Sequence, residues 1–155
     1  IFNVAAENDC PYILMHMRGT PANMMEHTNY DKLLLDLLHY FSVQIGKAEK
    51  AGVKDIIIDP GFGFSKALDQ NFEVLKQLDL FGALGKPLLA GLSRKSMIYK
   101  TLNTSPEESL NGTTALNMIA LKKGAMILRV HDVKPAHEAI ALHLKLNSIH
   151  ENSEA

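Results

Sequence analysis

The sequence lacks several features that mark specialised classes of protein. Its 155 residues include one cysteine, Cys10, which excludes an internal disulfide. No apolar run reaches the roughly 18 residues that a membrane span needs, and the first residues lack the basic start and apolar core of a secretory signal. An initiator methionine is also missing. We therefore expect a cytoplasmic protein without membrane contact, and a chain that starts inside a longer gene product.

An excess of charge of one sign is missing too. Sixteen basic and 17 acidic residues leave a net charge of −1, so we expect no nucleic acid partner. Hydrophobic residues make up 46% of the chain, which supports one core and hardly more than one domain. The histidines show no metal-type spacing to the cysteine or to paired carboxylates, so we assign no metal ligands within the chain.

What the sequence contains is a repeated strand-then-helix pattern. Short apolar runs over residues 11–17, 55–59, 88–91 and 125–130 each precede a segment of helical periodicity, and glycines separate the units. Four such units predict an α/β fold with a parallel sheet covered on both faces. Two closures are possible: an open doubly wound sheet, or half of a (β/α)8 barrel, whose complete form needs about 250 residues.

The helical segments carry recognisable end signals. The first, with apolar positions between 34 and 48, ends at Gly52, and the second runs from about residue 69 to 82 or 85. A short helix to about residue 102 follows. Ser105, Pro106 and Glu108 have the residue types of an N-cap and first turn, so they predict the start of the next helix. Asp132 is predicted to cap the last helix, and residues 147–155 to form a loose tail.

Chemistry-bearing residues gather at the predicted carboxyl ends of the strands, where function concentrates in both architectures. Asp59 ends the second strand, and two interpretations of it stay open. Its carboxylate either caps the following loop by accepting backbone N–H groups, or accepts paired hydrogen bonds from the amidine-like edge of a heterocycle. The GFGF run behind it allows close backbone approach and leaves two aromatic rings on a loop.

The third and fourth strand ends are rich in positive charge. The sequence SRKS over residues 93–96 opens a helix and offers a cationic corner, unless it is only a basic surface turn. Arg129 interrupts an apolar strand, so its guanidinium must face a partner or a water-filled mouth. His131 stands at a helix start that favours a phosphate group. These residues predict substitution at a carbon that bears a phosphate-type leaving group, without a nucleophile–base triad.

Four strings, LMHMRGTP, DPGFGF, GLSRKS and RVHDV, occur in that order at the strand ends. Together they resemble the C-terminal half of the dihydropteroate synthase family, over about residues 11–146. The resemblance implies that residues 1–146 form strands 5 to 8 of a pterin-binding (β/α)8 TIM barrel, with a flexible tail over 147–155. It also implies the family's folate-pathway reaction, which sulfonamides block: 6-hydroxymethyl-7,8-dihydropterin diphosphate and 4-aminobenzoate give 7,8-dihydropteroate and pyrophosphate.

The resemblance assigns roles by motif. Asp59 would hold the amino-pyrimidine edge of the pterin, and Lys95 its carbonyl and N5 side. Arg129 would stack on the pterin and, with His131, bind the diphosphate; Lys95, Arg129 and His131 are the expected catalytic residues. The remaining substrate-binding residues implied by the motifs are Phe64, Ser96, Val130 and Met15, of which Phe64 and Ser96 would shape the aminobenzoate pocket.

The resemblance further implies that the diphosphate leaves first, with Mg²⁺ supporting the departing charge. The usual Mg²⁺ ligand and half of the pterin pocket belong to four βα units that this sequence lacks. Because a half-barrel exposes sheet edges, we expect either a homodimer or a fragment that is inactive alone. Two alternatives stay open: a non-catalytic half-barrel assembly module, and a methyltetrahydrofolate-type pterin-binding domain. The RVHD sequence argues against the second, because it suits a diphosphate and a methyl donor carries none.

Overall fold

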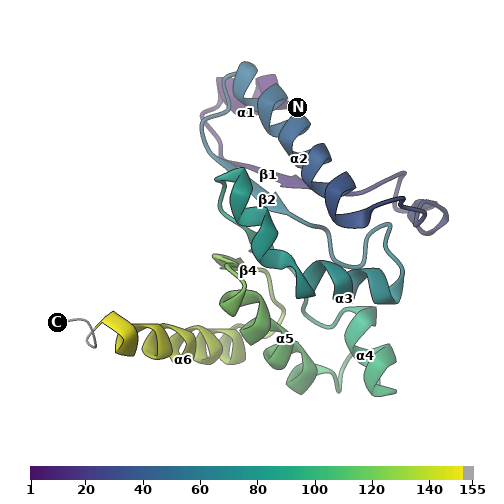
Figure 1. Ribbon diagram of the computed structural model, residues 1–155, viewed down its shortest axis with the longest axis vertical. Helices are drawn as coiled ribbons and strands as arrows, with labels where there is room; N and C mark the ends of the chain where they lie inside the picture. Colours follow the sequence, from purple (N-terminus) through teal and green to yellow (C-terminus); the bar gives the residue numbers. More distant parts are fainter. Residues whose placement is uncertain (152–155) are drawn as a thin grey trace.

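Strands and helices alternate along most of the chain, which a computed structural model describes over residues 1–151 (Figure 1). The strands are β1 (Tyr12–Met15), β2 (Ile56–Asp59), β3 (Leu89–Ala90) and β4 (Ile127–Leu128). The α-helices are α1 (Phe2–Glu7), α2 (Leu33–Lys50), α3 (Leu68–Lys76), α4 (Ser96–Leu102), α5 (Leu110–Lys122) and α6 (Val133–Glu151). Two 3-10 helices, η1 (Met24–Glu26) and η2 (Leu78–Leu84), complete the described elements.

The strand pairs of the described residues are parallel, and their spatial order follows the chain. β1 pairs with β2, and β3 pairs with β4. A parallel bridge between Ile58 and Leu88 joins the two pairs. A doubly wound sheet would reverse its strand order at a switch point. The sequential order β1-β2-β3-β4 therefore favours the barrel segment among the two predicted closures.

Side chains alternate between the two faces of these strands. Leu14, Ile58 and Ala90 lie in the buried cluster beneath the helices. Ile13 and Ile57, which are paired in the register, point away from that cluster, and Ile13 is 50% exposed. Helices α2, α3 and α5 lie on one side of the strands in Figure 1. The helices thus cover one face of the strands, whereas the face that would line a closed barrel is open.

The core beneath the covered face is built mainly around α2. Its apolar residues recur at helical spacing, and Leu37 and Phe41 are completely buried. Phe41 meets Phe81 of η2 edge-on, with ring centroids 5.8 Å apart. Burying an aromatic or leucine side chain stabilises a fold by about 1.5–3 kcal/mol, so this packing holds β1 and β2 on α2.

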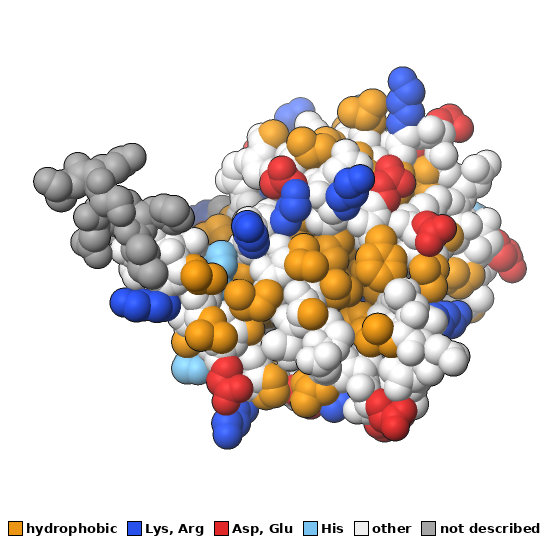
Figure 2. Space-filling model, turned by 60° about the horizontal axis from the view of Figure 1, so that its bottom comes forward, with side chains coloured by type: hydrophobic (Ala, Val, Ile, Leu, Met, Phe, Trp, Pro, Cys, Tyr) orange, Lys and Arg blue, Asp and Glu red, His pale blue; other side chains and the backbone are white. Residues whose placement is uncertain are grey.

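Apolar side chains also gather on the outer surface. Figure 2 shows hydrophobic residues collected on the face that carries α5 and α6. Ile119 of α5 and Leu142 and Leu146 of α6 are large apolar residues of these helices, each at least 43% exposed. The α6 helix projects away from the strands (Figure 1), so one side of it has few neighbours within the chain. No helix of residues 1–151 is long and apolar enough to cross a bilayer.

The structure differs from the sequence predictions at several element ends. The helix predicted from about residue 69 to 82 or 85 is divided into α3 and the 3-10 helix η2. Leu78 and Phe81, three residues apart and both fully buried, suit the three-residue period of a 3-10 turn. The short helix α1 near the N-terminus was not predicted. At the other end, α6 continues to Glu151, so residues 147–151 of the expected loose tail are helical; residues 152–155 lie outside the described part.

The predicted capping pair before α5 forms, but the helix starts later. The Glu108 N–H donates to Ser105 Oγ at 3.3 Å, whereas α5 begins only at Leu110. The cause is Arg94, whose guanidinium donates to the carbonyls of Pro106 and Glu107. These carbonyls are thereby engaged outside the helical ladder, and residues 106–109 remain a turn.

Candidate functional site

The carboxyl ends of the four strands form one layer of side chains on the open face. Met15 pairs with Asp59 in the β1–β2 register. The β3–β4 register, Ala90 with Leu128, brings Gly91 beside Arg129, whose backbone N–H donates to the Ala90 carbonyl at 3.0 Å. Alternation places this layer on the same face as Ile13 and Ile57. The fold therefore brings an acidic and a basic side chain to the same edge of the sheet, from the ends of β2 and β4, with β3 between them.

Asp59 is 4% exposed and divides its two oxygens between different partners. Its Oδ1 accepts the Gly61 backbone N–H at 2.8 Å, which is the loop-capping interaction that the sequence suggested. Its Oδ2 faces the Arg129 guanidinium, 3.8 Å away. Burial raises the pKa of the Asp59 carboxyl, and the Gly61 N–H, Arg129 and Lys95 act in the opposite direction. The cap thus uses one oxygen and leaves the other for a ligand.

Arg129 lies just beyond β4, not within the strand as predicted, because pairing of β4 ends at Leu128. Its side chain is 56% exposed, so the expected burial cost does not arise. The guanidinium lies against Gly91, where a Cβ atom would come within 2.8 Å of Arg129 Nη2. The glycine at this position leaves room for the guanidinium beside the end of β3. From there the guanidinium faces its ion-pair partner, Asp59, at the end of β2.

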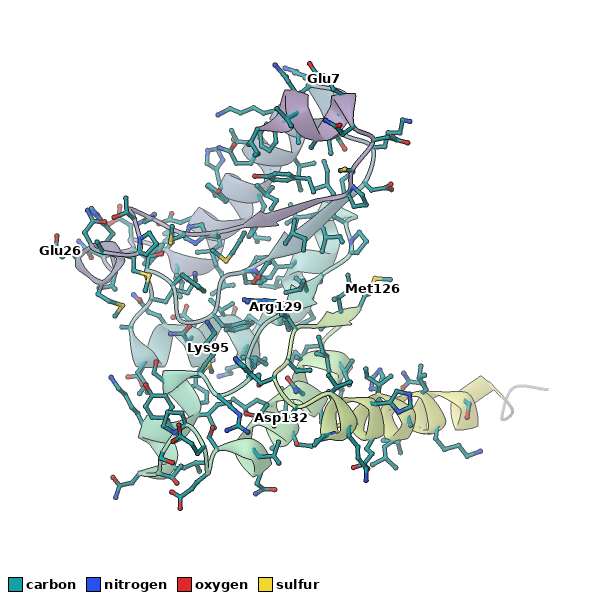
Figure 3. The ribbon with its side chains drawn as sticks, turned by 180° about the vertical axis from the view of Figure 1, so that it is seen from behind. Glu7, Glu26, Lys95, Met126, Arg129 and Asp132 are labelled. Atoms are coloured by element: carbon teal, nitrogen blue, oxygen red, sulfur yellow. The ribbon has the colours of Figure 1, made fainter. Side chains whose placement is uncertain are left out.

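Lys95 approaches the same place from the loop after β3. Its Nζ lies 4.4 Å from the centre of the Phe64 ring, and its stem passes Gly63. Burial lowers the pKa of the Lys95 ammonium; Arg129 lowers it further, and Asp59 opposes this shift. The structure therefore brings Asp59, Lys95 and Arg129 together, with Phe64 beside them. Figure 3 shows Lys95 and Arg129 where the chain leaves β3 and β4.

His131 is tied to the end of β3 through Ser93. Its Nδ1 lies 3.0 Å from Ser93 Oγ, and its backbone N–H donates to the same oxygen at 3.2 Å. Ser93 is buried, so it fixes the imidazole beside the start of α6. The exposed His131 ring keeps Nε2 for another partner.

Asp132 and Arg94 have a structural task instead. Asp132, predicted as a helix cap, accepts hydrogen bonds from Arg94 Nε at 3.0 Å and Nη2 at 2.8 Å. The ion pair joins the loop after β3 to the start of α6. The cationic corner predicted for residues 93–96 is therefore contributed by Lys95, because Arg94 is already paired.

The remaining predicted residues surround this group less directly. Ser96 is the first residue of α4, directly after Lys95, and is partly buried. Val130 lies between Arg129 and His131 and is also partly buried. Met15 is next to Asp59 in the register, and its side chain approaches the Gly61 backbone.

Sequence reasoning missed a buried polar network under the loop after β2. Lys66 is 2% exposed, and its Nζ contacts the Gly61 and Phe64 carbonyls and the His16 ring. Asn71 of α3 accepts the Gly63 N–H at 2.7 Å. The only signal in the sequence was a lysine at the end of the glycine–aromatic loop, which composition alone does not distinguish from a surface lysine.

The site is accessible to solvent, because the Arg129 side chain is 56% exposed and His131 is exposed. Two hollows of about 600 and 640 Å³ lie elsewhere, one between α5 and α6 and one near Lys86 and Met126 at the opposite strand ends. Within the described part of the chain, no three His, Cys, Asp or Glu side chains come together as a metal site. The strand-end side chains thus offer hydrogen-bond and charge partners for an organic anion, but the described residues hold no cluster of three metal ligands for Mg²⁺.

Comparisons with known proteins agree with this layout. The family model described as pterin binding enzyme matches residues 1–131. The chain is 46% identical over 138 residues to a dihydropteroate synthase of Escherichia coli (strain K12), covering 88% of this chain and 49% of that relative. It is 42% identical over 134 residues to the dihydropteroate synthase of Bacillus subtilis (strain 168), covering 85% of this chain and 45% of the relative.

Solved structures show the same half-length match. The dihydropteroate synthase of Yersinia pestis, in a sulfonamide drug complex, matches with a TM-score of 0.92 and 39% identity over 95% of this chain and 54% of that one. The enzyme of Thermus thermophilus, in complex with 4-aminobenzoate, matches with a TM-score of 0.91 and 36% identity over 94% of this chain and 60% of that one. The chain spans about half the length of the curated relatives it matches, and by its family match, its strand order and its strand-end residues it belongs to the pterin binding enzyme family.

Proposed function

We propose that this chain provides the C-terminal half of the active site of a dihydropteroate synthase, a transferase of folate biosynthesis. The observation that carries the proposal is the meeting of Asp59, Arg129 and Lys95 at the carboxyl ends of parallel strands. A flat pterin with a diphosphate tail needs an acceptor for its amino-pyrimidine edge and cations for its tail, and this layer supplies both.

We base the residue roles on the motif resemblance, and the geometry supports them. Asp59 Oδ2, free of the loop cap, accepts an N–H donor of the pterin edge. The exposed guanidinium of Arg129 lies flat against Gly91, so a pterin ring can stack on its outer side. His131, held by Ser93, and the first N–H groups of α6 bind the diphosphate.

The second substrate, 4-aminobenzoate, is proposed to lie between Phe64 and the start of α4 at Ser96. In the transfer, the bond between the pterin methylene carbon and the diphosphate oxygen breaks, and pyrophosphate leaves with the electron pair. The arylamine nitrogen then bonds to that carbon and releases a proton. Lys95 and Arg129 stabilise the departing negative charge, so the site needs no strong base.

The whole activity is proposed to require four further βα units. The chain covers about half of its relatives, and the strand face that lines a closed barrel is open, with Ile13 on that face 50% exposed. We expect the 155 residues alone to show no condensation activity. Mg²⁺ remains a proposal for the assembled enzyme. The family resemblance implies that its usual protein ligand belongs to the other units.

We further propose that the assembled enzyme is a cytoplasmic homodimer. The exposed apolar residues of α5 and α6, together with the groove of about 600 Å³ between these helices, form a surface suited to a second subunit. The single exposed cysteine fits a reducing compartment.

Two experiments test the proposed function. Mixing the chain with a separately produced N-terminal half of a dihydropteroate synthase should yield 7,8-dihydropteroate and pyrophosphate from 6-hydroxymethyl-7,8-dihydropterin diphosphate and 4-aminobenzoate. A stable complex of the two halves without turnover would instead favour a non-catalytic assembly module. In the same mixture, calorimetric titration should show tighter binding of 6-hydroxymethyl-7,8-dihydropterin diphosphate than of methyltetrahydrofolate; the reverse preference would favour a methyltransferase-type domain.

A further inference from the structure

A buried lysine sits beneath the loop that carries Phe64. Lys66 Nζ lies 3.1 Å from the Gly61 carbonyl oxygen, 3.1 Å from the Phe64 carbonyl oxygen and 3.2 Å from His16 Nδ1. The residue is 2% exposed, so water does not supply these contacts. An ammonium group has three N–H donors, and the three neighbours are three acceptors. Each donor therefore has one partner, and the amine links both ends of residues 61–64 to the end of β1.

The arrangement fixes the state of the histidine. His16 Nδ1 must accept from Lys66, so its proton resides on Nε2. Burial, with Lys66 and Arg18 adding to it, lowers the pKa of His16 to about 3, and the ring is therefore neutral near pH 7. Burial also lowers the pKa of the Lys66 ammonium to about 7, while Asp59 opposes this shift.

The loop held by Lys66 carries two parts of the candidate site. The Gly61 N–H donates to Asp59 Oδ1, and the Phe64 ring contacts Lys95. The loop has no room to shift toward β1, because a Cβ atom at Gly61, where φ is +72°, would collide with the His16 carbonyl oxygen. Other contacts, such as Gly63 N–H to Asn71, fix its middle. Lys66 thus joins the two ends of the loop, in addition to the Phe64 N–H, which donates to the Gly61 carbonyl.

We propose that Lys66 is a positioning residue for the pterin and aminobenzoate subsites, acting through the Gly61–Phe64 loop. Its ammonium keeps the Gly61 N–H on Asp59, which leaves Oδ2 turned toward a ligand, and keeps Phe64 over Lys95. The identity of the ligand in this inference rests on the proposed function. The effect of Lys66 on the order of the loop does not. It assigns no contact between Lys66 and substrate.

The sharpest test compares two side chains that differ only in the ammonium. In a Cys10→Ser, Lys66→Cys chain, alkylation of the single thiol in denaturant with 2-bromoethylamine restores a lysine-like ammonium, whereas 1-bromopropane gives a neutral side chain of equal length. After refolding, hydrogen exchange measures protection of the Phe64 amide, and NMR spectra report on the Phe64 ring. Calorimetry measures the affinity for the probe, 6-hydroxymethyl-7,8-dihydropterin diphosphate. The exposed Lys76 of α3, treated identically, is the matched control.

The neutral derivative should lose about tenfold in protection of the Phe64 amide, which bonds the Gly61 carbonyl, and the aminoethyl derivative should recover it. Protection of Val53, in the α2 core, should be the same in both. Binding of the probe should weaken in the neutral derivative only. Equal loop protection in the two derivatives would overturn the inference. Equal affinity of the two derivatives for the probe would also overturn the inference, but it would leave the proposed function intact. If the ammonium restores loop order but neither the derivatives nor the native chain binds the probe, the proposed function alone is refuted.

One measurement needs no variant and covers the case in which the neutral side chain prevents folding. In the unmodified chain near pH 5.5, below the pKa of about 7 for Lys66 and above the pKa of about 3 for His16, nitrogen chemical shifts should show His16 with an unprotonated Nδ1 and a proton on Nε2. A proton on Nδ1 would mean that the ring does not accept from Lys66, and would contradict the proposed tie.

Discussion

Asp59 shows how one side chain can serve the fold and the site together. Its Oδ1 caps the loop through Gly61, and its Oδ2 faces Arg129. The structural and the functional interpretation of this residue are therefore compatible, because each uses a different oxygen. A substitution that retains the hydrogen bond from Gly61 but weakens binding at Oδ2 distinguishes the two roles of Asp59.

We predict that Asp59→Asn leaves the fold intact but weakens binding of the pterin diphosphate. The asparagine oxygen can still accept the Gly61 N–H, but an amide cannot offer a charged acceptor to the pterin edge. A loss of about 10- to 100-fold in affinity is expected from a charge-assisted pair, measured by calorimetry on the complemented enzyme. Asp69→Asn, on the exposed first turn of α3, is the control and should have no effect. Unchanged affinity in Asp59→Asn would remove this residue from the site.

His16 makes the stability of the chain depend on pH. Its pKa is 6.5 when exposed and about 3 in the fold, because burial and the neighbouring Lys66 disfavour its charged form. The unfolded chain therefore binds more protons between these values, and stability should fall as pH drops from about 6.5 toward 3. The full effect is on the order of 5 kcal/mol. Burial raises the pKa of Asp59, which acts in the opposite sense.

The test compares urea unfolding of the native chain and of His16→Asn at pH 7 and pH 4. An asparagine oxygen can replace Nδ1 as acceptor but does not titrate. The native chain should lose more stability on acidification than the variant does. Parallel losses in the two proteins would show that His16 is not buried in its neutral form.

At the residue scale, the sequence predicted the strand-end groups but not their supporting network. Asp59, Lys95 and Arg129 stood out because polar residues at the carboxyl ends of apolar strands have few structural explanations. Lys66 did not, because its role depends on how the loop closes over His16, and that contact joins residues 50 positions apart. Local pattern carries no information on such a contact.

At the scale of elements, Arg94 and Asp132 hold the start of α6 to the loop after β3. Arg94 adopts a positive φ of 54°, which costs energy for a side-chain-bearing residue. Its bonds to Asp132 and to the carbonyls before α5 stabilise this conformation. Arg94 thus contacts both the turn before α5 and the residue before α6.

We predict strong coupling between these two residues. Arg94→Met and Asp132→Asn should each lower Tm, and the double variant should be scarcely less stable than the Arg94 variant, because the first change already breaks the pair. Thermal unfolding of the four proteins forms the cycle, with Lys134→Met, an exposed and weakly paired site on α6, as control. Additive losses would mean that the two side chains contribute independently.

The same pair explains why sequence analysis placed the start of α5 too early. The capping residues Ser105 and Glu108 interact as expected, but Arg94, distant in sequence, takes the carbonyls that the first helical turn would use. Similarly, the division between α3 and η2 follows from burial of Leu78 and Phe81 against α2. Strand and helix order could be predicted from periodicity, whereas these ends depend on tertiary contacts.

At the scale of the whole molecule, the chain presents two unsatisfied surfaces. The open strand face and the free edges of β1 and β4 suit the other βα units of a barrel. The groove between α5 and α6 lies apart from these strand edges and is the surface that we propose for a second subunit. The proposed barrel completion and the proposed dimerisation therefore use different parts of the chain.

We predict that Leu142→Glu weakens the homodimer of the complemented enzyme without preventing the two halves from associating. Leu142 is 64% exposed and lines the groove between α5 and α6, far in sequence from the strand edges. Sedimentation velocity should show loss of the dimer of barrels, with retention of the paired halves. A dimer unaffected by this change would place the subunit interface elsewhere; Leu102→Glu, on α4, is the control.

The central claim is that the strand-end layer around Asp59 is the pterin diphosphate site. An NMR titration of the 155-residue chain with 6-hydroxymethyl-7,8-dihydropterin diphosphate tests it most directly, because it locates weak binding residue by residue. We predict saturable shifts at Gly61, Phe64, Lys95, Arg129 and His131, and none in the groove between α5 and α6. Shifts confined to that groove, or none at the strand ends at millimolar probe, would contradict the account.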